Sequence, residues 1–332
     1  GSGPILSRER VEASLRRRQG RPLFLIDIGV PRNIDPDVHE IDNAYLYDLD
    51  GRDYLDFLSG YSVFNIGRNH PVEKEAIRDV LEMDLPNMVQ MDCSLLSGLL
   101  AEALLKKTPP HLDAVFFCNS GTESMEGAIK FARAATERSG LVSMEKSFHG
   151  LTNGSLSVMG DAHFREGFEP LPSGFIRVPY NDFQAVERAA AADARVRAVW
   201  IEVLQGEGGI QVANLDYVRA LRRLCDERGW LLMIDEVQSG IGRTGKWFAH
   251  QWAGITPDVM TLAKGLGSGV PIGALLTGGR AAGVFGPGQH GTTFGGGPLA
   301  MRAGIETLAI IESEGLMANA VAQGERIRAG LK

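Results

Sequence analysis

The chain has little of what disulfide-bonded and metal-binding proteins need. Its 332 residues include three cysteines, Cys93, Cys118 and Cys225, which are odd in number and too widely separated for a zinc site. The seven histidines are scattered, and none forms the His-x-x-x-His pair of a metalloprotease helix. We therefore expect a reducing, cytoplasmic setting and no bound metal ion.

Long apolar runs and excess positive charge are also scarce. No apolar run approaches the roughly 20 residues needed to cross a bilayer. The N-terminus lacks the core of a signal peptide, and residues 1–3 are typical of a cloning remnant. A net charge of −7 disfavours a phosphate backbone as the main partner. We expect neither a membrane nor a nucleic acid as a partner.

What the chain does have is an alternation of strand and helix patterns. Hydrophobic residues make up 44% and charged residues 23%, which is ordinary for a globular protein. Short apolar runs typical of buried strands occur at residues 114–118, 141–144, 197–203, 230–234, 259–263 and 272–277. Helical patterns separate them. This alternation predicts an α/β fold with a mostly parallel central sheet and helices on both faces.

Outside these runs the sequence predicts a basic helical arm, a hairpin and three further helices. Residues 5–20 form a basic helix with Leu6, Val11 and Leu15 on its apolar side, and 45–57 form a hairpin around Asp50 and Gly51. Two helices are expected at 123–139, capped by Gly140, and at 217–228, ended by Gly229. After Pro298 the chain is predicted to stay helical to Lys332. The expected division is a helical arm (1–21), a segment with the hairpin (22–60), a large domain (61–297) and the helical start of a further domain (298–332).

Lys264 is the most informative residue. It follows the apolar run 257–263 and precedes the glycine-rich stretch 265–273, so a ligand can approach it closely. Burial disfavours the ammonium form and lowers the pKa, which turns a lysine into a nucleophile for carbonyl carbon. Taken alone, an ordinary lysine in a glycine turn is the more common explanation.

Asp235 gives Lys264 a chemical context. It ends the apolar run 230–234, and ligands of parallel sheets bind at the carboxyl ends of the strands. A lysine and an acid at such an edge match pyridoxal phosphate: the lysine holds the aldehyde as a Schiff base, and the aspartate keeps the ring nitrogen protonated. An acid at a strand end can also be a helix cap.

Polar residues after other strands extend this pattern. Ser120 and Glu123 have capping-box spacing, and the same helix start could bind a phosphate through backbone N–H groups. No Gly-Lys-Ser/Thr follows, which disfavours a nucleoside triphosphate. Phe148 could stack on a flat ring or be a plain core residue. Glu202 ends another strand, while Glu207 lies in a glycine loop; the hydroxyls of 291–297 offer a second phosphate contact.

Several motifs in the same order resemble the class III pyridoxal-phosphate aminotransferases, most of all the members acting on ornithine, acetylornithine, putrescine and related amines. The motifs are Asn119-Ser120-Gly121-Thr122-Glu123, Phe148-His149-Gly150, Gln205-Gly206-Glu207, Asp235-Glu236-Val237-Gln238 with its continuation to Gly245, Ala263-Lys264-Gly265 and Gly291-Thr292-Thr293-Phe294-Gly295-Gly296. The resemblance covers nearly the whole chain from about residue 22. It implies fold type I of the pyridoxal-phosphate-dependent transferases.

The resemblance also implies residue roles. Lys264 bonds the cofactor and shuttles a proton, Asp235 pairs with the ring nitrogen, Gln238 bonds the ring's phenolic oxygen, and Phe148 and Val237 sandwich the ring. The cofactor-binding set it implies is Ser120, Gly121, Thr122, Phe148, His149, Glu202, Asp235, Val237, Gln238, Lys264 and Thr293.

Substrate and partner roles follow from the same resemblance. Tyr61 is similar to a substrate-contacting tyrosine, and Glu207 to a gate that pairs with an arginine when an amine is bound. Thr293 is implied to reach the phosphate of a neighbouring subunit, as in a homodimer with shared active sites. The substrates implied are an amine or ω-amino donor and a keto-acid acceptor such as 2-oxoglutarate.

Two departures from the family pattern leave other functions open. Leu151 stands where ornithine and acetylornithine enzymes carry an arginine for a substrate carboxylate, which favours a diamine or an amine with an apolar arm. From the sequence we expect that the family's C-terminal small domain, with a second carboxylate-binding arginine, is absent from this chain. The alternatives are an aminomutase or decarboxylase on the same fold, and a non-catalytic fragment that binds the cofactor. A nicotinamide dehydrogenase is disfavoured, because 265–267 open no helix and Pro271 soon follows.

Overall fold

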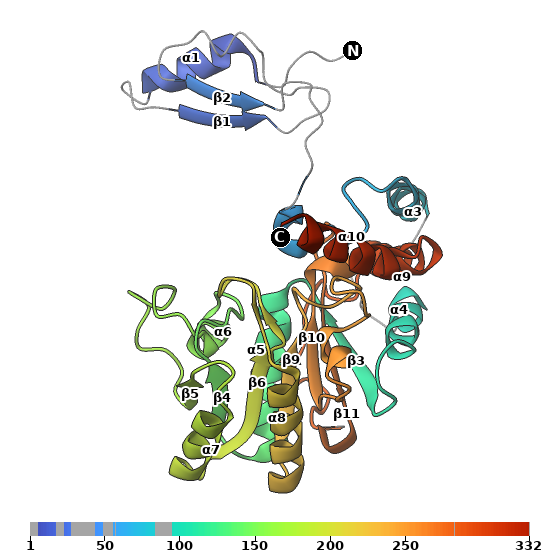
Figure 1. Cartoon of the computed structure of the whole chain (residues 1–332). Helices are drawn as coiled ribbons and strands as arrows, with labels where there is room; N and C mark the ends of the chain where they lie inside the picture. Colours follow the sequence, from blue (N-terminus) through green and yellow to red (C-terminus); the bar gives the residue numbers. More distant parts are fainter. Residues whose placement is uncertain are drawn as a thin grey trace. The chain divides into compact units, whose positions relative to one another are not determined.

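The computed structural model describes residues 6–17, 23–27, 44–48, 56, 58–83, 95–281 and 283–331 (Figure 1). By its contacts the chain divides into two compact units, residues 1–57 and residues 58–332. Each unit is described by itself. The four-part division expected from the sequence stays a prediction.

The first unit contains one helix and two strands. They are α1 (Arg8–Arg17), β1 (Leu23–Asp27) and β2 (Ala44–Asp48). Val11 and Leu15 are buried while Arg16 and Arg17 are exposed, as the pattern of the arm predicts. Strand β2 pairs in parallel with β1. The turn of the expected hairpin, at Asp50 and Gly51, lies outside the described residues.

The second unit is built on a seven-stranded sheet with the order β3-β11-β10-β9-β6-β4-β5. Strand β11 runs antiparallel to both of its neighbours, and the other pairings are parallel. The strands are β3 (Leu112–Cys118), β4 (Gly140–Met144), β5 (Phe175–Val178), β6 (Val196–Glu202), β9 (Leu231–Asp235), β10 (Val259–Leu262) and β11 (Gly273–Gly278). The predicted α/β fold with a mostly parallel sheet is confirmed.

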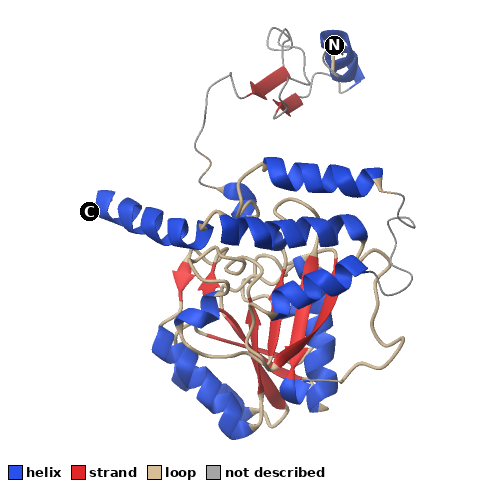
Figure 2. Ribbon diagram, turned by 90° about the vertical axis from the view of Figure 1, so that its right-hand side faces the viewer, coloured by secondary structure: helices blue, strands red, loops and turns tan. Residues whose placement is uncertain are grey.

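The alternation of side chains along β9 explains why both faces of the sheet are covered. Leu231 and Met233 pack in a core with α5 (Gly121–Thr136), whereas Leu232 and Ile234 pack in a core with α7 (Phe183–Ala192) and α8 (Leu215–Arg228). Since successive residues of a strand point to opposite faces, a wholly apolar strand needs a helix layer on each side. Figure 2 shows helices on both faces of the red sheet.

Further helices pack over the β10 and β11 side of the sheet. A third core joins Met260 and Leu262 of β10 to α4 (Leu95–Leu105) and α9 (Pro298–Ser313). The remaining elements are α2 (Ser59–Ser62), α3 (Pro71–Glu82), α6 (Asn153–Val158), α10 (Leu316–Gly330), the short strands β7 (Leu204–Gln205) and β8 (Gln211–Val212), and the 3₁₀ turns η2 (Ala249–Trp252), η3 (Lys264–Leu266) and η4 (Gly279–Ala281). Among the described residues no helix is both long and apolar enough to cross a membrane.

Two boundary predictions were wrong. Gly140 does not cap α5, because Glu137 ends that helix in the left-handed conformation, with φ of 52°. Gly140 instead starts β4, where a Cβ atom would lie 2.6 Å from the backbone of Arg195. The predicted continuous helix after Pro298 is two helices, because Gly315 adopts a φ of 63° between α9 and α10.

Candidate active site

A cavity of about 740 Å³ opens at the carboxyl ends of the central strands. Strand β9 brings Asp235 to it, β6 brings Glu202, and the turn after β10 brings Lys264. The loops after β3 and β4 add Ser120 and Phe148. Residues far apart in the sequence meet here because parallel strands end at the same edge of the sheet.

Almost every site residue predicted from the sequence lines this cavity. They are Tyr61, Ser120, Gly121, Thr122, Phe148, His149, Glu202, Glu207, Asp235, Val237, Gln238 and Lys264. Thr293 does not line it; its side chain is exposed on the loop between β11 and α9. Leu151 lines the cavity and is 57% exposed, so it lies at the mouth of the cavity.

Lys264 lies in a tight turn, where the backbone leaves the extended conformation of β10. Its φ is 39°, in the left-handed region, and it begins η3 directly after β10. A Cβ atom at the next residue, Gly265, would lie 2.2 Å from Nδ2 of Asn65 and would displace that amide. Burial lowers the pKa of Lys264, while the carboxylates of Asp235, Glu202 and Glu207 oppose that shift. A lowered pKa increases the fraction of neutral amine, the nucleophilic form, at a given pH.

Asp235 is held from two sides. It is 4% exposed, its Oδ1 accepts the N–H of Val237 at 2.9 Å, and its Oδ2 lies 2.8 Å from Nδ1 of His149. A carboxylate can only accept, so His149 donates from Nδ1. The imidazole ring packs against Trp200, with 5.1 Å between ring centroids. Two fixed donors orient the Asp235 carboxylate toward the cavity.

Glu202 lies next to Asp235, because β6 and β9 pair with these two residues in register. Its Oε2 accepts the N–H of Phe148 at 3.0 Å. Burial raises the pKa of Glu202 well above its usual range, and the neighbouring Asp235 carboxylate raises it further. Glu202 therefore takes up a proton more readily than an ordinary glutamate.

The start of α5 offers a binding place for a phosphate. The Ser120 side chain accepts the N–H of Glu123 at 3.3 Å, and the first intrahelical bond runs from the N–H of Ser124 to the Ser120 carbonyl. The N–H groups of Gly121 and Thr122 thus remain at the cavity without a helical partner. Ser120 caps the helix, but the predicted capping box is incomplete, because Oε2 of Glu123 accepts the N–H of Asn119 at 2.7 Å and not that of Ser120. The phosphate contact at the same turn stays a prediction.

The mouth of the cavity is formed by close backbone contacts. Nε2 of Gln238 donates to the Tyr61 carbonyl at 3.3 Å. Residues 59–62 all have positive φ, a left-handed turn that places Tyr61 at the rim. A Cβ atom at Gly206 would lie 1.2 Å from Oε1 of Gln238, so a side chain there would displace the Gln238 amide. These contacts bring three separate segments within reach of one ligand.

Sequence reasoning missed the residues that tie this rim together. Asn65 donates from Nδ2 to the Ile241 carbonyl at 2.6 Å and accepts from the Arg243 guanidinium. The same guanidinium contacts Ser59 Oγ at 3.3 Å. The partners lie more than 170 positions apart in the chain, and no spacing rule links them.

The site fits a flat, phosphorylated aromatic aldehyde. A nucleophilic amine, a held carboxylate and a helix N-terminus line one cavity, and these are the groups that pyridoxal phosphate requires for its aldehyde, ring nitrogen and phosphate. The fold and the site together define a pyridoxal-phosphate-dependent enzyme.

Comparison with known proteins gives the family. The "Aminotransferase class-III" family model matches residues 30–332, and a "Shikimate / quinate 5-dehydrogenase" model matches residues 1–52. Acetylornithine aminotransferase 1 of Bordetella parapertussis is 50% identical over 298 residues, covering 87% of this chain and 74% of the relative. Acetylornithine aminotransferase of Methanocaldococcus jannaschii is 44% identical over 80% of this chain and 67% of its own.

Solved structures agree. Ornithine aminotransferase from Toxoplasma gondii, a structure described as having partial occupancy of PLP at the active site, has a TM-score of 0.81 and 31% identity, over 86% of this chain and 68% of that one. An (S)-enantioselective omega-transaminase from Thermomicrobium roseum has a TM-score of 0.78 and 31% identity, over 82% and 68%. The chain belongs to the class III aminotransferases. It is a pyridoxal-phosphate-dependent transaminase that passes an amino group from an amine or ω-amino donor to a keto acid.

Proposed function

We propose that Lys264 and Asp235 are the catalytic residues of this transaminase. The observation that carries the proposal is their meeting at one cavity, with the pKa of Lys264 lowered by burial. Lys264 would hold the cofactor through its Nζ and would carry a proton to or from the substrate carbon. Asp235 would keep the ring nitrogen protonated. Pyridoxal phosphate, when bound, supplies a ring that accepts the electrons released at the substrate carbon.

The other lining residues hold and orient the cofactor in this proposal. Gly121 and Thr122 bind the phosphate through their N–H groups, with Ser120 at the same turn. Phe148 and Val237 lie against the ring faces, and the remaining polar contacts come from Gln238, His149 and Glu202. His149 keeps the Asp235 carboxylate in place, and Glu202 supports the ring from the side.

The donor favoured by the cavity has no carboxylate at its far end. Among the described residues that line the cavity there is no arginine, and Leu151 stands exposed at the mouth. A carboxylate beside Leu151 would lose water without gaining a charged partner. Glu207 is the exposed acid of the lining and can pair with a second ammonium group, while Tyr61 contacts the substrate chain. A diamine, or an amine with an apolar arm, matches these surroundings.

A donor panel tests this assignment. We expect kcat/KM to be higher for putrescine than for N-acetylornithine, with 2-oxoglutarate as acceptor. Leu151→Arg should shift the preference toward N-acetylornithine by roughly tenfold, because one charge-assisted hydrogen bond contributes about 1.5–3 kcal/mol. Leu151→Met is the matched control and should leave the order unchanged. A parent enzyme that prefers N-acetylornithine, together with no effect of Leu151→Arg, contradicts the assignment.

We also propose a homodimer with shared active sites. Thr293 is exposed and outside the lining of its own cavity, which suits a contact with the phosphate site of a second copy. Large apolar side chains next to it and on α3 and α4 are exposed as well: Phe294 at 62%, Leu81 at 63% and Leu95 at 77%. Such a surface favours association. The cytoplasm, the expected setting, remains part of the proposal.

Mixing two damaged variants tests the shared site. Lys264→Ala should be inactive, and Thr293→Ala should bind the cofactor weakly. In a hybrid dimer one of the two sites receives both native residues, so refolding the variants together should restore activity above that of either alone. No restoration, in protein shown to be dimeric by light scattering, contradicts the shared site.

A further inference from the structure

Glu236 follows Asp235 in the chain but faces the opposite way. It is 1% exposed and is not among the residues that line the cavity. Its N–H donates to the Thr261 carbonyl at 3.0 Å, which continues the pairing of β9 with β10 by one residue. Its carboxylate is therefore buried beside the site and plays no part in the chemistry proposed above.

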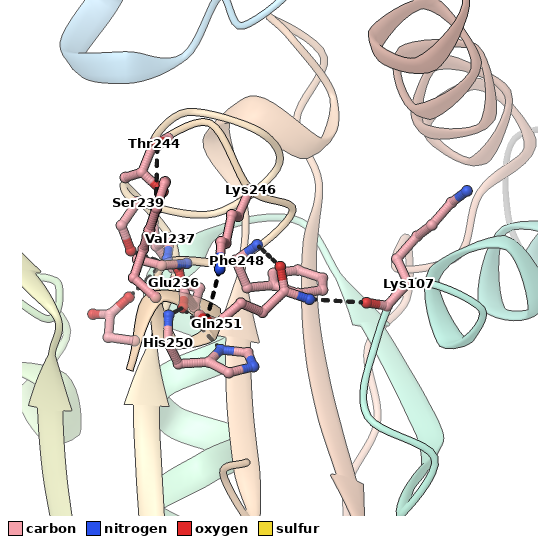
Figure 3. Close-up of polar contacts among 12 residues, drawn as sticks. Lys107, Glu236, Val237, Ser239, Thr244, Lys246, Phe248, His250 and Gln251 are labelled. Atoms are coloured by element: carbon pink, nitrogen blue, oxygen red, sulfur yellow. Dashed lines mark hydrogen bonds and ion pairs between the residues drawn. The ribbon is translucent and has the colours of Figure 1, made fainter. Parts of the chain in front are cut away.

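The Glu236 carboxylate collects donors from two segments. From its own turn, Ser239 Oγ donates to Oε2 at 2.6 Å. From the start of η2, the N–H of Ala249 donates to Oε2 at 3.0 Å, and the N–H of His250 donates to Oε1 at 2.9 Å. Nδ1 of His250 lies 3.0 Å from the same Oε1 and is the donor of that bond. Figure 3 shows these contacts converging on Glu236.

The η2 side of this contact is firmly attached to the rest of the unit. Phe248 is fully buried in the core of β10, α4 and α9, and its ring stacks on His250 with 5.6 Å between centroids. Gln251 accepts the N–H of Phe248 at 3.2 Å and donates to the Lys107 carbonyl at 3.4 Å, as Figure 3 shows. Glu236 thus ties its turn to a segment anchored in the core.

The other end of the same turn carries the proposed cofactor contacts. Asp235 precedes Glu236, and Val237 and Gln238 follow it; all three line the cavity. The Gly240 N–H donates to the Glu236 carbonyl at 2.9 Å, which closes the turn. A small rotation of this turn would move the Asp235 carboxylate and the Gln238 amide together. Groups that hold functional residues in this way set their affinity and electrostatics without touching the ligand.

We infer that Glu236, with His250 and Ser239 as its side-chain donors, is a positioning residue that fixes Asp235, Val237 and Gln238 for the cofactor. The inference rests on the proposed role of Asp235. Glu236→Gln tests it, since the amide keeps the shape but turns an N–H₂ group toward donors on one side or the other. We expect roughly tenfold weaker binding of pyridoxal phosphate, by analogy with outer-shell partners of metal ligands. We also expect a shift of the pH midpoint of the visible absorption band of the holoenzyme.

A matched control separates positioning from stability. Asp258 is 6% exposed and accepts the Leu232 N–H at 2.8 Å, at the opposite end of β9. Asp258→Asn should lower the melting temperature but leave the cofactor affinity and the pH midpoint unchanged. His250→Phe keeps the stack on Phe248 and both backbone donors, so its effect on affinity should be smaller than that of Glu236→Gln. If Glu236→Gln does not fold, His250→Phe and Ser239→Ala carry the test, and each should weaken cofactor binding at least twofold.

The outcomes distinguish the two proposals. Suppose that Asp235→Asn moves the pH midpoint, while Glu236→Gln leaves both the midpoint and the cofactor affinity at the parent values. The positioning inference is then overturned. The same holds if Glu236→Gln does not fold and both His250→Phe and Ser239→Ala leave these two quantities unchanged. If Asp235→Asn itself moves nothing, the proposed role of Asp235 fails, and the inference falls with it. A midpoint shift in Glu236→Gln, absent in Asp258→Asn, supports it.

Discussion

The two ends of strand β9 use buried charge in different ways. At the carboxyl end, Asp235 faces a cavity of about 740 Å³ together with Glu202 and Lys264. At the other end, Asp258 is bonded to the Leu232 N–H at 2.8 Å and to Arg222 at 2.8 Å. A smaller hollow of about 300 Å³ lies there, but its charges are paired with one another. A buried charge thus indicates a functional site where it faces space for a ligand. It indicates a role in stability where other protein groups pair with it and bond to it.

The largest effect is expected at the cavity end. Lys264→Ala removes the nucleophile, so turnover should fall at least 10³-fold, the upper range for a lost preorganised group. Burial lowers the pKa of Lys264 below that of the unfolded lysine, so below that unfolded value its protonation opposes folding. The cofactor-free variant should therefore melt no lower than the parent at pH 7. Steady-state kinetics and thermal melting by circular dichroism measure both; a variant retaining more than a tenth of the activity breaks the comparison.

Asp235→Asn should come next. The amide keeps the size and the contact with the Val237 N–H but removes the charge, and we expect kcat to fall by about 10²–10³. The new amide nitrogen faces Nδ1 of His149, which accepts from it when the ring takes its other tautomer, so the melting temperature should change little. Kinetics with saturating cofactor isolate the effect on turnover from that on binding. Unchanged kcat under those conditions would mean that Asp235 is structural, like Asp258.

Asp258→Asn should show the reverse behaviour. It weakens the pairing with Arg222 at a buried position, and we expect a loss of about 1–3 kcal/mol in the free energy of unfolding. The kcat of the folded enzyme should stay within twofold of the parent. Urea unfolding and kinetics below the melting temperature measure the two quantities. A large loss of kcat with unchanged stability would erase the difference between the ends of β9.

The smallest effect tests whether a shifted pKa alone marks function. Burial raises the pKa of Glu73 to about 7, although it lies on α3 against α9 and does not line the cavity. Its folded-state pKa exceeds the unfolded value of 4.5, so its stabilising effect is full below pH 4.5 and is lost as pH rises through about 7. Glu73→Gln should raise stability at pH 8 by about 1–3 kcal/mol relative to pH 5, with kcat unchanged. Urea unfolding of the parent and the variant at both pH values measures this effect. If the variant and the parent differ by the same free energy of unfolding at pH 5 and pH 8, the raised pKa of Glu73 is contradicted.

Much of the fold followed from the sequence because the strands of a parallel sheet are buried on both faces. The six predicted strands all exist, each within two residues of its expected bounds. The two errors occurred where a single residue adopts the left-handed backbone conformation. Glu137 ends α5 in place of Gly140, and Gly315 divides the last predicted helix into two. A left-handed glutamate has no sequence signal, since propensity favours glycine there.

The site was predictable to the extent that each residue follows a strand. Asp235, Glu202 and Lys264 could be brought together on that rule alone. Asn65, His250 and the outward direction of Glu236 could not, because their contacts join segments that no local pattern relates. Resemblance supplied the role of Gln238, but the reason that Gly206 faces it appears in the packing.

The central claim is that Lys264 and Asp235 act on one bound cofactor. Reducing the pyridoxal-phosphate-loaded protein with borohydride fixes the lysine–cofactor bond, and peptide mass spectrometry then locates it. The account predicts one phosphopyridoxyl group per chain, on Lys264, with labelling abolished in Lys264→Ala and diminished at limiting cofactor in Asp235→Asn. A label on another lysine in the parent protein, or undiminished labelling of Lys264→Ala, would contradict it.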